Sequence, residues 1–349
     1  MTLSQTASFT KKVITLSLLV LFLSTTAFIS YKIWHNYYIS HLPPVEEKPD
    51  TKFGLLPPPD FPKSAVSSSN YSYSLDTTTG SLPKVGVDAG FDKIIKVYFL
   101  PKSFATLLSS EKAQNLATKF NITSDPQILS ETKYRFQDQG KTLTMDLDTG
   151  NFLYQKEATI SGKETLEPDD KLVSDLQNIL NTLGILTDDL KKGRSKITLL
   201  KSQGKNLVPT NLRIESQAVQ ISLWPQNINQ KPIFTSNFNK ALTFVQLIKS
   251  ASNLDNYLTI QLVTFPIDTS TFATYPTKSA EEAYNNLKGG KGVVILEPPK
   301  PQVSISSVYL GYYLADNYQP YLEPIFVFEG QNFVAYIPAV ADEFISQTK

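Results

Sequence analysis

Cysteine is absent from the 349-residue chain, and this absence excludes several kinds of chemistry. Without thiols the protein has no disulfides, no cysteine-bound zinc or iron–sulfur cluster and no cysteine nucleophile. A lipoprotein anchor is excluded too, because its lipid is attached to a cysteine. Any anchor or catalytic group must therefore come from other side chains.

Histidine is nearly absent, with only His35 and His41, which both follow closely on a hydrophobic segment. The rest of the chain has no imidazole, which excludes a Ser-His-Asp triad and histidine-based metal sites. The glycine motifs of nucleotide-binding loops and of serine hydrolases are missing as well. We therefore predict a protein that is not an enzyme and that holds no cofactor or metal. The net charge of +1 gives no reason to expect nucleic acid as a partner.

One long uncharged run is present, from Val13 to Tyr31. As a helix it would span roughly 29 Å, which matches the core of a bilayer. Lysines precede the run and acidic residues follow it, so the N-terminus is expected in the cytoplasm and the rest outside. We predict a cytoplasmic tail at residues 1–12 and an uncleaved transmembrane anchor at residues 13–34, with Val13, Leu16, Leu19, Phe22, Phe28, Tyr31 and Trp34 in contact with the bilayer. A cleaved signal peptide is the alternative.

Residues 35–70 are rich in proline and serine. Proline fixes φ and removes an amide donor, so neither a helix nor a central strand is expected here. We predict a semi-rigid linker that holds the folded part away from the bilayer.

Three helix-and-strand units are predicted after the linker, at residues 71–158, 159–265 and 266–349. Each contains one amphipathic helical segment, at residues 109–120, 169–183 and 279–287. The remaining apolar runs are separated by turn residues, as antiparallel strands are. The predicted class is α+β, with a single N-terminal transmembrane helix followed by antiparallel-sheet units that each carry a packed helix.

The turn Asp146–Gly150 has the opening spacing of a calcium-binding loop. The bidentate glutamate that such a loop needs would fall at position 156, which is Lys156. We therefore interpret this segment as a hairpin turn.

The C-terminal stretch carries a resemblance to a known family. It contains SAEEAYNNLKGG, VSISSVYLGYY and YLEPIFVFEGQNFVAYIPAV, and residues 134–154 are similar to the end of the same unit. These pieces resemble the repeat of PepSY-type domains and of YycH/YycI-like regulatory proteins, mainly over residues 279–340. The resemblance implies a bacterial protein with one N-terminal anchor and an extracytoplasmic domain. It also implies action by binding, as an inhibitor or as a modulator of a membrane histidine kinase.

Five tyrosines gather near the C-terminus: Tyr309, Tyr312, Tyr313, Tyr318 and Tyr321. Exposed tyrosines suit contacts with a protein partner, whereas packing inside the core is the alternative interpretation. Taken together, the sequence predicts a membrane-anchored extracytoplasmic protein that binds and regulates a protein partner. Two alternatives remain open: a cell-wall hydrolase that uses carboxylates such as Glu323 and Glu329, and a passive structural protein of the envelope.

Overall fold

The structure is a computed structural model, and it describes residues 3–40, 48–76, 82, 92–157, 165–204 and 206–346, with helix side chains from residue 14 to residue 38. The chain divides into two compact units, Met1–Lys48 and Pro49–Lys349. The described residues of the first unit, up to residue 40, form one helix, and the second unit, called the body below, holds the strands that the structure describes.

The N-terminal helix α1 spans Leu3–Ser40. Within it, Ile14–Tyr38 is long and apolar enough to cross a membrane. The helix continues past the predicted end of the anchor at residue 34. No proline interrupts the chain before residue 43, and aromatic rings one turn apart stack, with 5.5 Å between the ring centroids of Trp34 and Tyr38.

The predicted anchor residues lie along this helix. Their described side chains are all more than half exposed within the protein, as lipid-facing side chains are: Leu16, Leu19, Phe22, Phe28, Tyr31 and Trp34. The side chain of Val13 lies outside the described residues.

The body contains a nine-stranded sheet in which every described pairing is antiparallel. Its strands are, in order of pairing, β3 (Gln127–Ser130), β4 (Lys133–Asp138), β5 (Lys141–Asp146), β6 (Phe152–Lys156), β12 (Tyr257–Leu262), β11 (Thr243–Leu247), β9 (Ala218–Leu223), β7 (Ser195–Gln203) and β8 (Asn206–Pro209). The predicted first and middle units both contribute strands to this sheet, which they share through the pairing of β6 with β12.

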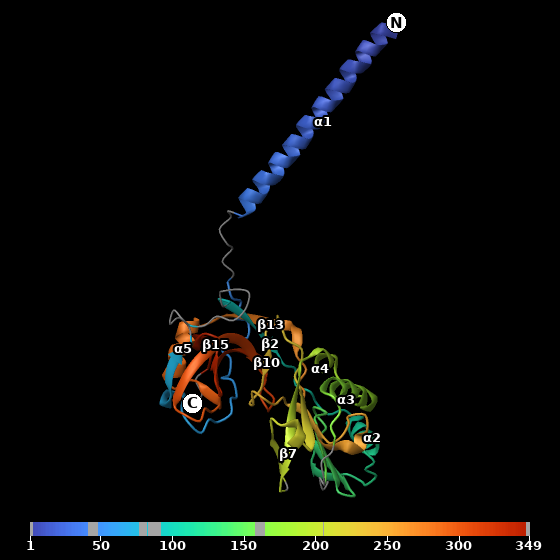
Figure 1. Cartoon of the computed structure of the whole chain (residues 1–349), viewed down its shortest axis with the longest axis vertical. Coiled ribbons are helices and arrows are strands. Elements are labelled where there is room, and N and C mark those ends of the chain that lie inside the picture. Colours follow the sequence, from blue (N-terminus) through green and yellow to red (C-terminus); the bar gives the residue numbers. More distant parts are fainter. Residues whose placement is uncertain are drawn as a thin grey trace. The chain divides into compact units, whose positions relative to one another are not determined.

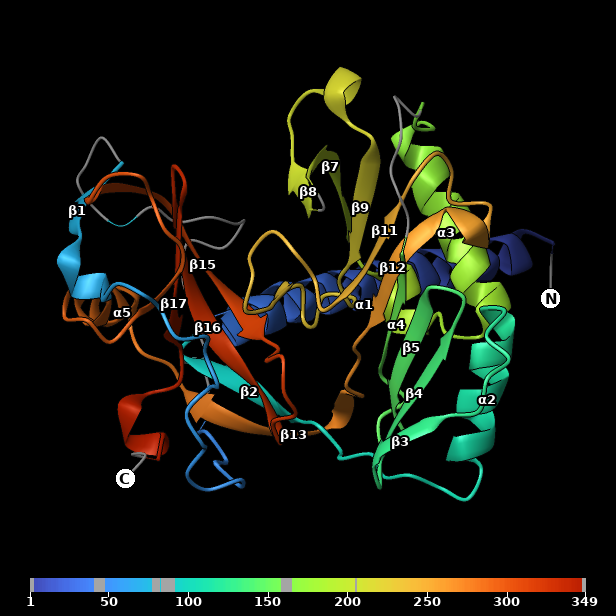
Figure 2. The same ribbon diagram turned by 90° about the horizontal axis from the view of Figure 1, so that it is seen from below.

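Two helices cover one face of the nine-stranded sheet, α2 (Ser109–Lys119) and α3 (Asp169–Leu183), as Figure 1 and Figure 2 show. Helix α3 begins after Pro168 and ends at Gly184, whose φ of 72° lies in the left-handed region that favours glycine. The short helix α4 (Asp188–Lys192) follows, and its N-cap Thr187 accepts a hydrogen bond from the Leu190 amide.

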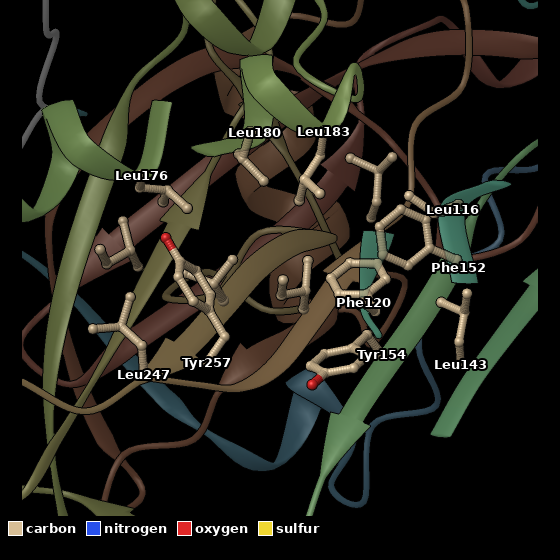
Figure 3. Close-up of a cluster of buried hydrophobic side chains, with 14 of the residues drawn as sticks. Leu116, Phe120, Leu143, Phe152, Tyr154, Leu176, Leu180, Leu183, Leu247 and Tyr257 are labelled. Carbon is tan, nitrogen blue, oxygen red and sulfur yellow. The ribbon is translucent and has the colours of Figure 1, made fainter. Parts of the chain in front are cut away.

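The core between these helices and the sheet is built from leucines of the helices and aromatic residues of the strands (Figure 3). Phe120, just after α2, stacks on Tyr154 of β6 with ring centroids 4.3 Å apart. Tyr257 of β12 is fully buried, and its hydroxyl donates to the Ala251 carbonyl. The helices therefore cover one face of the sheet, whereas the other face is partly exposed at β4 and β5 and buried at β9, where Gln220 and Ser222 are buried.

A second sheet of eight strands contains the C-terminal part of the chain. In order of pairing, five of its strands are β1 (Ser72–Leu75), β15 (Gln302–Tyr313), β16 (Tyr321–Gly330), β17 (Phe333–Pro338) and β14 (Val293–Leu296). Three more strands join this path: β10 (Ile233–Phe234) pairs with β15, and β2 (Ile94–Phe99) pairs with both β13 (Asp268–Pro276) and β16. Strands from all three predicted units therefore meet in this sheet.

Helix α5 (Ala280–Lys288) packs on the eight-stranded sheet through Ala283 and Leu287. Its N-cap is Ser279, whose side chain accepts from the Glu282 amide. This helix and the strand pair β16–β17 confirm the α+β class, with helices packed on sheets that are mainly antiparallel. In the eight-stranded sheet, β1 and β10 pair in parallel with β15.

From residue 49 onward, the proline-rich segment predicted as a linker packs against the body instead of standing free as a spacer. Apolar residues between the prolines pack on the eight-stranded sheet: Leu56 is fully buried, and Phe61 contacts the ring of Tyr313. Further along, Ser68 is buried and its hydroxyl donates to the Leu287 carbonyl. Proline prevents a helix here, but it does not prevent an extended chain from lying against a sheet.

Candidate functional site

The five tyrosines predicted as a partner-binding cluster lie in or against the core of the eight-stranded sheet. Tyr312 and Tyr313 are buried, and the other three are half-buried. Four hydroxyls donate inside the protein: Tyr309 to Glu329, Tyr312 to the Lys96 carbonyl, Tyr313 to the Asp60 carbonyl and Tyr318 to the Leu100 carbonyl. Tyr321 stacks on Phe53. In this conformation the rings hold the fold together, as the alternative interpretation describes.

Glu323 and Glu329, the carboxylates considered for a hydrolase, do not form a glycosidase pair. They lie six residues apart on the same strand β16, which corresponds to roughly 20 Å. A glycosidase requires about 5 to 10 Å between its two carboxyl groups. Glu329 accepts a hydrogen bond from Tyr309 at the end of the strand, whereas Glu323 is buried.

The free edge of the nine-stranded sheet is a better candidate for a functional surface. Strand β3 pairs with β4, and within the described part of the chain no strand pairs with its outer side. All four residues of β3 are exposed, and Ile128 has 66% of its side-chain surface accessible. The opposite edge is shielded differently, because β8 ends at Pro209, which has no amide donor.

A groove lies beside this edge, on the face of the sheet that the helices leave open. It has a volume of about 670 Å³, and Leu129 of β3, Lys133 and Arg135 of β4 and Gln155 of β6 are among its lining residues. Ile128 pairs with Tyr134, which packs against the helix-side core, so Ile128 faces that side. The exposed edge therefore presents apolar side chains toward both faces of the sheet.

The charges in the groove are predominantly positive. Arg135 is half-buried, and neither it nor Lys133 takes part in an ion pair within the described ranges. The Arg135 Nε atom is buried without a hydrogen-bond partner among the described residues. Asp146, the acidic residue of the groove, has one carboxylate oxygen engaged by the amides of Asp148 and Thr149. The guanidinium of Arg135 is thus available for an acidic group from outside.

The same bonds settle the role of Asp146 in the turn that follows β5. Its Oδ1 atom accepts from two backbone amides and from the Thr149 hydroxyl, while Gly150 has a φ of 74°. This is the hairpin turn that the sequence predicts.

Exposed apolar residues continue around the β3 end of the sheet. Leu107 and Leu108, just before α2, have 102% and 58% of their surfaces accessible. The Ser110 hydroxyl lies 3.5 Å from that of Tyr134, the cross-strand partner of Ile128, so the start of α2 lies beside this edge. Large apolar side chains gathered at one exposed site are typical of a contact surface.

Sequence reasoning identified only part of this surface. Residues 133–137 (KYRFQ) alternate between polar and apolar side chains, which predicts a strand with Lys133 and Arg135 on one face. Strand β3 was not predicted, because only Ile128 and Leu129 are apolar between Pro126 and Glu131. A short exposed edge strand has almost no periodic signal of its own.

Comparisons with known proteins give only distant likenesses. No family model matches the chain, and no curated protein matches it. Among solved structures, an uncharacterised protein from Eubacterium rectale has a TM-score of 0.41 and 10% identity, over 70% of this chain and 82% of that one. The Bacillus megaterium YpeB C-terminal domain has a TM-score of 0.27 and 10% identity, over 69% of this chain and 95% of that domain.

Proposed function

We propose that this is a single-pass membrane protein whose body lies on the extracytoplasmic side and binds a protein partner at the β3 edge. The partner contributes an extended segment that adds to the nine-stranded sheet as a further strand. Binding there restrains or relays the activity of that partner, for which a membrane sensor kinase is the example suggested by the resemblance to PepSY-type and YycH/YycI-like proteins.

The unpaired edge of β3 is the observation that carries the proposal. Edge strands in natural proteins are usually protected, because their free amide and carbonyl groups pair readily with another chain. Here the edge has exposed apolar side chains and lies beside a groove with an uncommitted arginine. The segment that fits has apolar residues for the two faces and an acidic residue for Arg135.

The orientation in the membrane rests on the lysines that precede the apolar run, since positive charge favours the cytoplasmic side. A protease added to intact cells therefore digests the body, whereas a tag placed before residue 12 is protected. Protection of the body in intact cells would contradict this orientation.

Photo-crosslinking in intact membranes tests the binding site. A crosslinking amino acid at position 129 is expected to capture a polypeptide, whereas the same group at Leu207, on the β8 edge, is not. The variant Arg135→Glu is expected to abolish the capture, because it places a negative charge where the acidic group binds. Lys112→Glu makes the same charge change at an exposed position of helix α2. It serves as the matched control and is expected to leave the capture intact.

Two outcomes would contradict the proposal. One is equal capture from positions 129 and 207, which indicates unspecific contact. The other is capture that survives Arg135→Glu, since the groove then plays no part in recognition.

A further inference from the structure

A buried carboxyl group without a partner lies in the middle of the eight-stranded sheet. Glu323 has 2% of its surface exposed, and neither carboxyl oxygen has a hydrogen-bond partner among the described residues. Among the described residues Glu323 takes part in no ion pair, and Lys278, a buried lysine in this part of the body, is 2.6 Å from Asp342 instead. A carboxylate buried without a counter-charge is costly, so burial raises the pKa of Glu323 to about 8.

Tyrosine rings surround Glu323 on its own face of the sheet. Tyr313 is its direct partner across β15, and Tyr321 lies two residues away on β16. Burial is the main cause that raises the pKa of Tyr275 of β13, and the charge of Glu323 adds to it, so the two side chains lie near each other. A tyrosine side chain is neutral when protonated and negative when ionised, so none of these three neighbours supplies a positive charge to Glu323.

The segment that follows the anchor covers this face, and residues 50–61 are called the strap. Phe53 stacks on Tyr321 with ring centroids 4.9 Å apart, and Phe61 meets Tyr313 at 4.8 Å. The hydroxyls of Tyr275 and Tyr313 donate to the carbonyls of Gly54 and Asp60. The three tyrosines that surround Glu323 are thus all in contact with the strap.

Two further sets of hydrogen bonds hold the strap, one at its start and one in its middle. Asp50 accepts from the amide of Thr274 on β13. Leu56 is bonded on both sides to the C-terminal segment, with its amide donating to the Phe344 carbonyl and its carbonyl accepting from Ser346. The charged groups of the strap are Asp50, Lys52 and Asp60, and Lys52 lies over the rings of Phe53 and Phe272.

We propose that the strap is a releasable clamp, that it stays closed while Glu323 is protonated, and that it opens when Glu323 loses its proton. Deprotonation moves the carboxyl proton to water and leaves a carboxylate that the closed strap keeps dry. Opening hydrates that carboxylate. Because the strap lies in the chain after the anchor and before the strands of the body, pH on the body's side of the membrane then controls how much free chain lies between the anchor and the sheets.

The linkage sets the pH window in which the strap responds. With the strap closed Glu323 binds its proton up to about pH 8, and with the strap open it titrates near its ordinary value of 4.5. Opening therefore becomes more favourable as the pH rises from 4.5 to 8, by up to about tenfold for each pH unit, and levels off above 8. Acidic solution keeps the clamp closed.

Hydrogen exchange on the full chain in detergent micelles measures this opening. The Leu56 amide, which is bonded to Phe344, reports on the strap, and the Val245 amide in β11 reports on the nine-stranded sheet. After correction for the intrinsic pH dependence of exchange, the protection of Leu56 is expected to fall at least tenfold between pH 6 and 8. The protection of Val245, which is lost only when the sheet itself opens, is expected to remain higher than that of Leu56 at every pH.

Two variants complete the test. In Glu323→Gln the protection of Leu56 is expected to be independent of pH, because the amide does not titrate. Glu329→Gln, on the same strand but away from the strap, is expected to keep the wild-type response.

The proposal is overturned if wild-type Leu56 protection is the same at pH 6 and 8, which needs no variant. It is also overturned if Leu56 and Val245 have equal protection at each pH, since the whole body then opens rather than the strap. A pH response that persists in Glu323→Gln would assign the effect to another group.

Discussion

The stability of the body should depend on pH in a window where most proteins titrate histidines. Here the two histidines, His35 and His41, lie outside the body, so between about pH 5 and 8 Glu323 is the group whose raised pKa falls in the window. The carboxyls with lowered pKa values, such as Asp268 at about 2, are already ionised in both states above pH 5. They lose their contribution only in more acidic solution.

The sign follows from proton binding. Folded protein holds the Glu323 proton up to about pH 8, whereas the unfolded chain releases it near 4.5. Stability is therefore greatest below pH 4.5 with respect to this group and falls as the pH rises toward 8. Each pH unit contributes about 1.4 kcal/mol, so the upper limit over the window is about 5 kcal/mol.

Urea unfolding at several pH values measures this dependence. The free energy of unfolding of the wild type should fall by about 1 kcal/mol or more per unit between pH 5 and 8, while that of Glu323→Gln stays flat. A flat profile for the wild type would refute the reasoning, because it would mean that Glu323 is hydrated or paired in the folded protein.

Three further changes test the packing that positions the two sheets, each read out by urea unfolding at pH 6. Gly193→Ala should destabilise the body by about 3 kcal/mol, because the added Cβ would lie 1.8 Å from the Trp224 carbonyl oxygen; a neutral result would mean that this approach is not so close. Ser279→Ala should cost about 1 kcal/mol through loss of the cap to the Glu282 amide, whereas Ser279→Gly should cost only a few tenths, and equal losses would argue against a capping role. Leu176→Ala should lower the free energy of unfolding by about 2 to 5 kcal/mol, since Leu176 is a fully buried residue of α3, while Leu176→Met should lower it by less than about 1.5 kcal/mol. Equal effects of the two leucine changes would show that the site is not tightly packed.

The helices of the body could be predicted from sequence because local signals fix both of their ends. The prediction of a helix at residues 169–183 agrees with the bounds of α3, where Pro168 and Gly184 mark the boundaries. Ser279 likewise marks the start of α5. Helix α2 is an exception in detail: Ser109 is its first residue rather than its side-chain cap, and its hydroxyl accepts from the Thr106 amide.

The arrangement of the strands could not be predicted in the same way. Strand β13 (Asp268–Pro276) reads DTSTFATYP, which has little apolar alternation, and it forms because β2 pairs with it from a distant part of the chain. The groove beside β3 could not be predicted for the same reason, since it exists only where β3 forms the edge of the sheet. The burial of Glu323 could not be predicted either, because an acidic residue in a strand is expected to be exposed unless the segment that covers it is known.

The two features proposed as functional lie on different sheets: Glu323 and the strap on the eight-stranded sheet, and the β3 groove on the nine-stranded sheet. Four segments of the described chain connect the sheets, between β2 and α2, β9 and β10, β10 and β11, and β12 and β13. All four contribute walls to one cavity of about 330 Å³, through Ser103, Pro225, Leu242 and Phe265.

Side chains around a cavity lack partner atoms on one side and give up dispersion energy there, so the junction is packed less tightly than either core. A small displacement of one sheet against the other therefore costs less at the junction than a distortion within a sheet. Coupling of the strap to the groove would pass across this junction, through these four segments and through side-chain contacts such as that of Arg194, just before β7, with Phe234 of β10.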